Sequence, residues 1–199
     1  MKSISFSALA PAVIAVSAMF SVATSSFAQA APQVKFATTA GDFVVEVYPD
    51  KAPKTVENFL QYVKDKHYDG TIFHRVIENF MVQGGGFDAK YEQKPTRAPV
   101  VHEGREALAK GGPKNVAGTL AMARTNDPQS ATAQFFINVK DNAFLDPTAQ
   151  SFGYTVFGKV IGGMDVVQKI KTTPTGPGGP FPSDVPKTPI LINTATLVK

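Results

Sequence analysis

Short runs of β-prone residues, each ended by Gly, Pro, Asn or Asp, constrain the fold of this chain more than any other feature. Such runs recur from the first third of the sequence to its end, at a spacing that suits an antiparallel barrel or sandwich. The sequence therefore predicts a mainly β domain of about eight strands. The predicted strands are Val34–Thr38, Phe43–Val47, Thr71–Ile77, Met81–Gln83, Thr119–Met122, Phe135–Val139, Tyr154–Val160 and Ile190–Val198.

Two segments have the periodicity of short amphipathic helices instead. The first has apolar residues at i, i+3, i+4 and i+7 after a proline that suits a first helical turn, namely Val56, Phe59, Leu60 and Val63 after Pro53. In the second, Met164, Val167 and Ile170 share one side. The sequence thus predicts two helices.

Glycine and proline mark two places of irregular backbone. The segment 173–189 contains six prolines and three glycines, and we expect a surface loop there, with neither a helix nor a regular ladder. Gly84, Gly85 and Gly86 follow a predicted strand but lack the strand, loop and helix context of a phosphate site. They predict a bulge or a close backbone approach.

The first residues have the pattern of a secretory signal. A basic start at Lys2 precedes the small and apolar run Ala8–Val22, and small-x-small cleavage sites follow. A membrane anchor is the alternative, but the apolar run contains Pro11 and falls short of the roughly 20 apolar residues that span a bilayer. We expect cleavage after Ala28 or Ala30, a periplasmic protein without membrane insertion, and one domain over residues 29–199.

Composition excludes several kinds of chemistry. The chain has no cysteine, which rules out disulfides, thiolate metal sites and a cysteine nucleophile. The formal charge of +4 is small and scattered, so nucleic acid is not an expected partner. The serine-elbow, P-loop and H-E-x-x-H patterns are missing, and His67, His74 and His102 lack ligand spacing. Neither a metal nor another cofactor is predicted.

One segment places a cation among apolar residues. Strand alternation puts Phe73, Arg75 and Ile77 on one side and His74 and Val76 on the other. The Arg75 stem could simply cover apolar surface while its head reaches water. Alternatively, the guanidinium is held at the rim of an apolar pocket. Strand alternation does not decide between these two interpretations of Arg75. Residues 133–138 also place polar side chains beside aromatics, and that pattern alone does not distinguish a core strand from a pocket wall.

Several motifs in order resemble the cyclophilin family of peptidyl-prolyl isomerases, particularly its short, secreted bacterial branch. They are Phe73-His74-Arg75-Val76-Ile77, Phe80-Met81-x-Gln83-Gly84-Gly85, Gly118–Ala123, Gln134-Phe135-Phe136-Ile137, Phe144-Leu145-Asp146 and Val156-Phe157-Gly158. The resemblance implies a closed eight-stranded antiparallel β-barrel capped by two α-helices, with a substrate groove on its outer face. It also implies isomerisation of X-Pro bonds without a cofactor, in proline-containing peptides and unfolded exported proteins, by a monomer.

The same resemblance assigns roles to single residues. Arg75 would donate a hydrogen bond to the prolyl nitrogen and so act as the catalytic residue. The proline ring would lie in an apolar pocket, and further residues would bind the chain around it. The pocket residues are Phe80, Met81, Phe136 and Leu145; the others are Gln83 for the substrate backbone, Ala123 and Arg124 for the segment before proline, and Gln134, Phe144 and Tyr154.

Three positions depart from the better-known eukaryotic pattern. Phe144 replaces a Trp, Tyr154 a His and Arg124 an Asn. The Trp supplies an indole N–H to the inhibitor cyclosporin, and a Phe cannot donate, so we expect weak cyclosporin binding with retained isomerase activity. A non-catalytic chaperone or peptide-binding module on the same barrel remains the alternative function.

Overall fold

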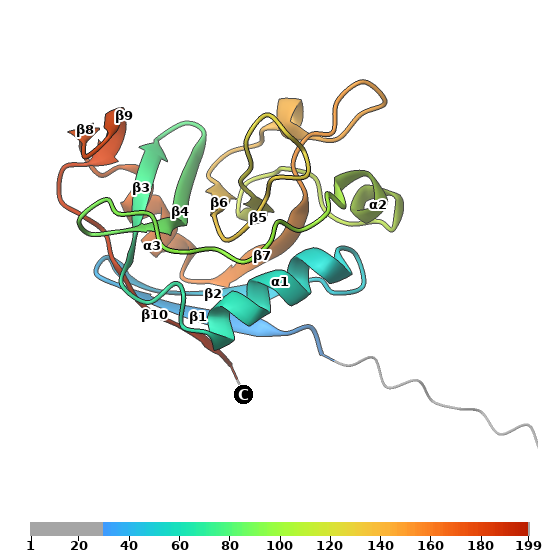
Figure 1. The fold of residues 1–199 in the computed structure, drawn as a ribbon, viewed down its shortest axis with the longest axis horizontal. Helices are drawn as coiled ribbons and strands as arrows, with labels where there is room; N and C mark the ends of the chain where they lie inside the picture. Colours follow the sequence, from blue (N-terminus) through green and yellow to red (C-terminus); the bar gives the residue numbers. More distant parts are fainter. Residues whose placement is uncertain (1–29, 199) are drawn as a thin grey trace, which may run out of the picture.

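The computed structural model describes residues 30–198, which form one barrel-like domain (Figure 1). The predicted signal segment lies outside the described residues. Eight strands form one antiparallel sheet in the order β10-β1-β2-β7-β5-β6-β4-β3. These strands are β1 (Gln33–Thr38), β2 (Gly41–Val47), β3 (Thr71–Ile77), β4 (Met81–Asp88), β5 (Thr119–Met122), β6 (Phe135–Asn138), β7 (Val156–Gly162) and β10 (Ile192–Leu197).

The first two strands form the predicted hairpin. Alternation along β1 buries Val34 and Phe36, and Phe36 lies directly opposite Phe43 of β2. Their rings stack with centroids 4.9 Å apart. An apolar pair opposite each other on the inner face fixes the register, because a slip by one residue would turn both side chains to the outside.

Backbone hydrogen bonds close the sheet into a barrel. The two end strands, β3 and β10, meet through the segment that precedes β10. Gly70 N–H donates to Ile192 O at 2.8 Å and Phe73 N–H to Ile190 O at 3.0 Å. The predicted mainly β, eight-stranded antiparallel barrel is confirmed. Closure removes the exposed edges that an open sheet would present.

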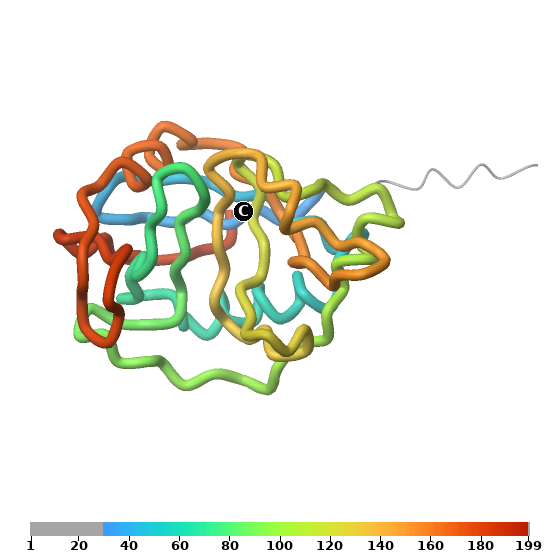
Figure 2. Tube along the Cα trace, turned by 90° about the horizontal axis from the view of Figure 1, so that it is seen from above, coloured from blue at the N-terminus to red at the C-terminus, as the bar shows by residue number. Residues whose placement is uncertain are grey.

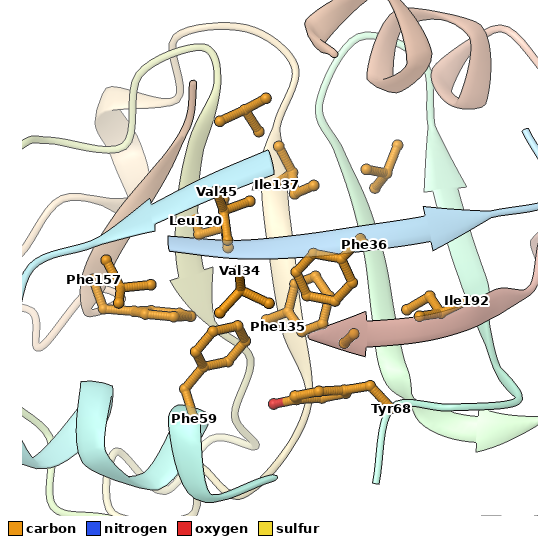
Figure 3. Packing of buried hydrophobic residues seen from close by; sticks show 14 of the residues in the cluster. Val34, Phe36, Val45, Phe59, Tyr68, Leu120, Phe135, Ile137, Phe157 and Ile192 are labelled. Carbon is orange, nitrogen blue, oxygen red and sulfur yellow. The ribbon is translucent and has the colours of Figure 1, made fainter. Parts of the chain in front are cut away.

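The largest fully buried side chains in the barrel interior are aromatic. Phe36, Phe59, Tyr68, Phe135 and Phe157 are all fully buried and pack against one another around the barrel axis (Figure 3). Their large apolar surfaces are removed from water together, and this burial supplies the main driving force for folding a domain without disulfides.

Helices close the two ends of the barrel. Figure 2 shows α1 (Pro53–Lys64) at one end and α3 (Met164–Lys171) at the other. As the periodicity predicts, α1 buries Val56, Phe59 and Val63, and α3 buries Val167 and Ile170. A third helix, α2 (Gly104–Ala109), and the 3₁₀ turn η1 (Ala143–Leu145) were not predicted, since six and three residues are too few to carry a periodic pattern.

The prediction of a loop without a ladder over 173–189 is wrong. The segment forms an antiparallel hairpin of β8 (Thr175–Gly178) and β9 (Phe181–Pro186). Each strand of a two-stranded ribbon has an outer edge without ladder hydrogen bonds, so a proline that lacks an N–H can be accommodated there. Tertiary packing stabilises it, because the Phe181 ring lies edge-on to Phe87 at 5.1 Å and against His74 at 5.4 Å.

Candidate active site

A pocket of about 310 Å³ lies on the outer face of the sheet. Its lining contains every residue that the sequence analysis named for the site, except Gln134. The lining residues are Arg75, Phe80, Met81, Gln83, Ala123, Arg124, Phe136, Phe144, Leu145 and Tyr154. Gln134 lies beside it and accepts a hydrogen bond from Gln83 Nε2 at 3.0 Å.

Strand alternation separates the pocket floor from the barrel core. Val82, Phe135 and Ile137 point into the main core, whereas Met81 and Phe136 belong to a second apolar cluster outside it. Leu145 of η1 joins this outer cluster. The β4, β5 and β6 strands thus carry core residues on one face and an apolar floor on the other.

A β-bulge in β3 decides where Arg75 points. The register between β3 and β4 shifts between Phe73 and Arg75. Phe73 therefore enters the main core together with Val76, while Arg75 and Ile77 face outward. The expectation that Phe73 and Arg75 share a face is wrong, because the bulge adds one residue to the alternation. Arg75 pairs directly with Gln83 on β4.

The glycine triplet lets neighbouring segments approach β4 closely, as predicted. A Cβ on Gly86 would lie 2.5 Å from Gln134 Cγ, and a Cβ on Gly84 would lie 3.0 Å from the Phe73 ring. Gly85 has φ of +84°, and a Cβ there would lie 2.8 Å from Tyr68 Cε1. Side chains at these positions would displace both the core and Gln134.

Arg124 is held rigidly at one wall of the pocket. Its Nε and Nη2 both donate to Gly153 O, at 3.1 and 2.8 Å, and Nη1 donates to Thr125 O at 2.8 Å. The guanidinium also lies 4.6 Å above the Tyr154 ring, a cation–π contact. Tyr154 in turn packs edge-on against Phe136 on the floor.

Sequence reasoning missed the polar groups that support the apolar wall. Asn142 donates to Phe80 O at 2.9 Å and to Asn138 Oδ1 at 2.8 Å. Asn115 donates to Leu145 O and, through its backbone N–H, to Asp146 Oδ1. All four polar residues are buried. The only signal in the sequence is that three asparagines, Asn115, Asn138 and Asn142, lie in this region, and several of their partners are 30 or more residues away and cannot be inferred from it.

His102 lies behind the Arg124 wall. Its Nδ1 accepts from Gly104 N–H, and its Nε2 lies 3.2 Å from Gly153 O, the carbonyl that also binds Arg124. This pattern requires the neutral imidazole with the proton on Nε2. Burial lowers the pKa of His102, although the Gly153 carbonyl opposes this. His102 therefore helps to hold the backbone next to the pocket.

Two further features bear on the kind of site. Within residues 30–198 no three metal-ligating side chains gather into a cluster. In the same part of the chain, no helix has the length and apolar character that a membrane crossing requires.

Comparison with known proteins agrees with this architecture. The sequence model of the family described as "Cyclophilin type peptidyl-prolyl cis-trans isomerase/CLD" matches residues 33–197. A peptidyl-prolyl cis-trans isomerase of Streptomyces antibioticus is 54% identical over 168 residues, which cover 83% of this chain and 98% of that protein. Peptidyl-prolyl cis-trans isomerase B of Escherichia coli K12 is 52% identical over 167 residues, with coverage of 82% and 98%.

A solved structure is similar in fold. A Cryptosporidium parvum cyclophilin type isomerase, crystallised in the presence of the dipeptide Ala-Pro, superposes with a TM-score of 0.63 at 24% identity. The superposition covers 84% of this chain and 99% of that chain.

The structure is a closed antiparallel β-barrel that carries a pocket with an apolar floor and an arginine on the outer face of its sheet. Together with the family match over nearly all described residues, it establishes that the chain belongs to the cyclophilin-type peptidyl-prolyl cis-trans isomerases. The predicted family and the predicted isomerase activity are confirmed.

Proposed function

We propose that this enzyme acts on X-Pro bonds of exported or unfolded proteins, and that the Arg75 guanidinium stabilises the twisted amide. One observation carries the proposal: Arg75 and Gln83 are opposite each other on β3 and β4, and both line a pocket of about 310 Å³ whose floor is apolar. Phe80, Met81, Phe136 and Leu145 would hold that ring, and Ala123 and Arg124 would line the segment before it.

The reaction needs no covalent step. The barrier of about 18–20 kcal/mol arises because twisting breaks the conjugation of the amide. In the twisted state the prolyl nitrogen regains its lone pair and can accept a hydrogen bond that the planar forms cannot accept equally well. The pocket lining contains no Ser, Thr, Cys, Asp, Glu or His. Tyr154 is the one lining residue with a hydroxyl group, and the isomerisation requires no covalent bond to it.

Arginine suits the proposed role. It stays charged, and its donors keep a fixed geometry. Shortening an exchange time of about 100 s to about a millisecond takes five decades, or roughly 7 kcal/mol. Removal of one preorganised donor typically costs about 10²–10³ in rate. The remaining acceleration must come from anchoring the chain on both sides of the bond, which is the role proposed for Gln83 and the apolar floor.

A refolding assay tests the mechanism. A substrate protein whose refolding is limited by X-Pro isomerisation would be mixed with wild type, Arg75→Ala and the control Arg105→Ala. We expect Arg75→Ala to lose about 100-fold or more of the acceleration, and the control to keep it. Equal acceleration by wild type and Arg75→Ala would contradict the mechanism.

A non-catalytic chaperone or peptide-binding module on the same barrel is the alternative. It predicts that wild type suppresses aggregation of the substrate protein without accelerating the proline-limited phase. Export is tested separately, by fractionation of cells and by sequencing the amino terminus of the mature protein. Recovery from the periplasm with a terminus at residue 29 or 31 would support it, and recovery of a full-length cytosolic protein would contradict it.

A further inference from the structure

The pocket and its surroundings carry positive charge without a neutralising partner. Within residues 30–198 the ion pairs join Lys35 to Asp42, Lys51 to Asp50 and Arg97 to Asp65, and none includes Arg75 or Arg124. No Asp or Glu lines the pocket. Both guanidiniums therefore keep their full charge at the surface that a substrate would contact.

Arg124 lies where the pocket joins a second one. This adjoining pocket, of about 350 Å³, shares Gln83, Ala123 and Arg124 with the first. Its other lining residues are polar and uncharged: Gln93, Thr96, Thr125, Ser130, Thr132 and Gln134. An extended peptide that runs from one pocket to the other must pass beside the Arg124 guanidinium, and neither pocket offers a carboxylate that would compete for it.

The Arg124 side chain is ordered before any substrate arrives. Carbonyl oxygens of Gly153, Thr125 and Asn126 accept four hydrogen bonds from it, and the Tyr154 ring lies against its face. Carbonyls satisfy the donors but leave the net charge in place. Four bonds to five N–H groups also leave one donor free for a ligand. An ion pair with this group would avoid most of the side-chain entropy cost that weakens ordinary surface pairs.

The acidic residue closest in sequence does not cancel this charge. Asp127 lies in the adjoining loop, where its Oδ1 accepts a hydrogen bond from Gln129 N–H at 2.8 Å. It forms no ion pair with Arg124 among the described residues. Glu103, which is nearer to the barrel, is buried and accepts hydrogen bonds from Lys54 and Thr55. Neither carboxylate belongs to either pocket.

We infer that Arg124 makes the enzyme selective for prolines preceded by an acidic residue, at one of the two positions on the amino side of the proline. The inference rests on the proposed function, which assigns Ala123 and Arg124 to that side of the substrate. The preferred substrate class is thus Glu-Pro or Asp-Pro segments and those with an acidic residue one position earlier. Lysine or arginine at the same positions is disfavoured.

Exchange NMR on short peptides tests this selectivity without a coupled protease. Two series would be compared, Ala-X-Pro-Phe and X-Ala-Pro-Phe, each with X as Glu, Gln or Lys. For wild type at low salt we expect kcat/KM for Glu to exceed that for Gln by about threefold to fivefold in at least one series, with Lys below Gln. The Glu to Gln ratio should fall toward one at about 0.5 M salt, because screening weakens exposed ion pairs.

Arg124→Gln should bring the Glu to Gln ratio to about one, whatever its effect on overall activity. Arg124→Lys should retain a ratio above one. Arg105→Gln is the matched control, because Arg105 is also held by two carbonyls, Thr148 O and Ala149 O, and lies 4.7 Å over a ring, that of Phe152. Arg105 lines neither pocket, and the Arg105→Gln substitution removes the same charge as Arg124→Gln. The Glu to Gln ratio of this control should therefore equal that of wild type.

The possible outcomes distinguish a failure of the proposed selectivity from a failure of the proposed function. A wild type that isomerises Ala-Ala-Pro-Phe but shows equal rates for Glu, Gln and Lys in both series would overturn the selectivity and leave the isomerase mechanism intact. An equal loss of the ratio in Arg124→Gln and Arg105→Gln would also overturn it, because net charge would then be the cause. A wild type inactive on all peptides would count against the proposed function itself.

Discussion

Gln83 and Gln134 meet at the boundary of the two pockets, where Gln83 Nε2 donates to Gln134 Oε1 at 3.0 Å. Gln83 belongs to β4, and Gln134 immediately precedes β6, which pairs with β4. The bond holds the amide of Gln83 in one orientation. Gly86 leaves space for the Gln134 side chain, since a Cβ there would meet it at 2.5 Å.

Gln134→Leu removes the acceptor while keeping a similar volume. We expect KM to rise about threefold to tenfold with kcat nearly unchanged. Without the acceptor the Gln83 amide is no longer held in one orientation, which weakens binding of the substrate backbone but does not affect the proposed hydrogen bond to the prolyl nitrogen. Steady-state kinetics on an Ala-Pro peptide would measure this, with Gln150→Leu in an exposed loop as the control. A fall in kcat with an unchanged KM would contradict this role for Gln134.

Glu103 acts as a distant cap for α1. The residue before the helix, Ala52, has no side chain that can cap, and the Glu103 carboxylate accepts from Lys54 N–H, Thr55 N–H and Thr55 Oγ1 instead. Glu103→Ala would leave these donors without a partner in a buried site. We expect a loss of about 3 kcal/mol in the free energy of unfolding.

Urea denaturation would measure the Glu103 effect against Glu106→Ala, an exposed carboxylate on the adjacent helix. The control should stay within about 0.5 kcal/mol of wild type. Equal midpoints for the two variants would show that the cap contributes nothing.

His74 makes folding sensitive to mild acid. Its ring is buried between Phe87 and Phe181, its Nδ1 has no hydrogen-bond partner among residues 30–198, and burial lowers its pKa to about 4. Above pH 6.5 the ring is neutral in both the folded and unfolded states. Between about pH 6.5 and 4 the unfolded chain binds a proton that the folded chain does not, so stability falls as the pH falls.

The His74 contribution to this loss should approach about 3 kcal/mol below pH 4. An NMR titration of the imidazole would locate the transition directly. We expect the His74 resonance to stay that of the neutral ring at pH 5. A midpoint above pH 6 would contradict the expected burial effect.

Phe144 bears on the cyclosporin prediction. Its ring is 73% exposed and stacks on Phe80 at 5.5 Å, so it can form an apolar contact but has no N–H. We expect weak binding to wild type and about tenfold tighter binding to Phe144→Trp, which restores one donor. Calorimetric titration would measure both affinities. Nanomolar binding to wild type would contradict the prediction.

Local patterns in the sequence predicted the regular part of the fold. Alternating apolar residues gave the β1–β2 hairpin and the core strands, and 3.6-residue periodicity gave α1 and α3, because these signals depend on neighbours within a few positions. The motifs that resemble cyclophilins named the residues that line the pocket, and their roles remain predictions.

Only the tertiary structure decided the features that depend on distant contacts. The packing of the β8–β9 hairpin on His74 and Phe87 and the cap that Glu103 gives to α1 join segments far apart in the chain. The bulge that turns Arg75 outward depends on the register between two paired strands. Alternation and propensity carry no information about such partners. The sequence by itself thus determined which residues are apolar enough for a core and a floor, whereas the closed barrel determined which charged groups line the pocket.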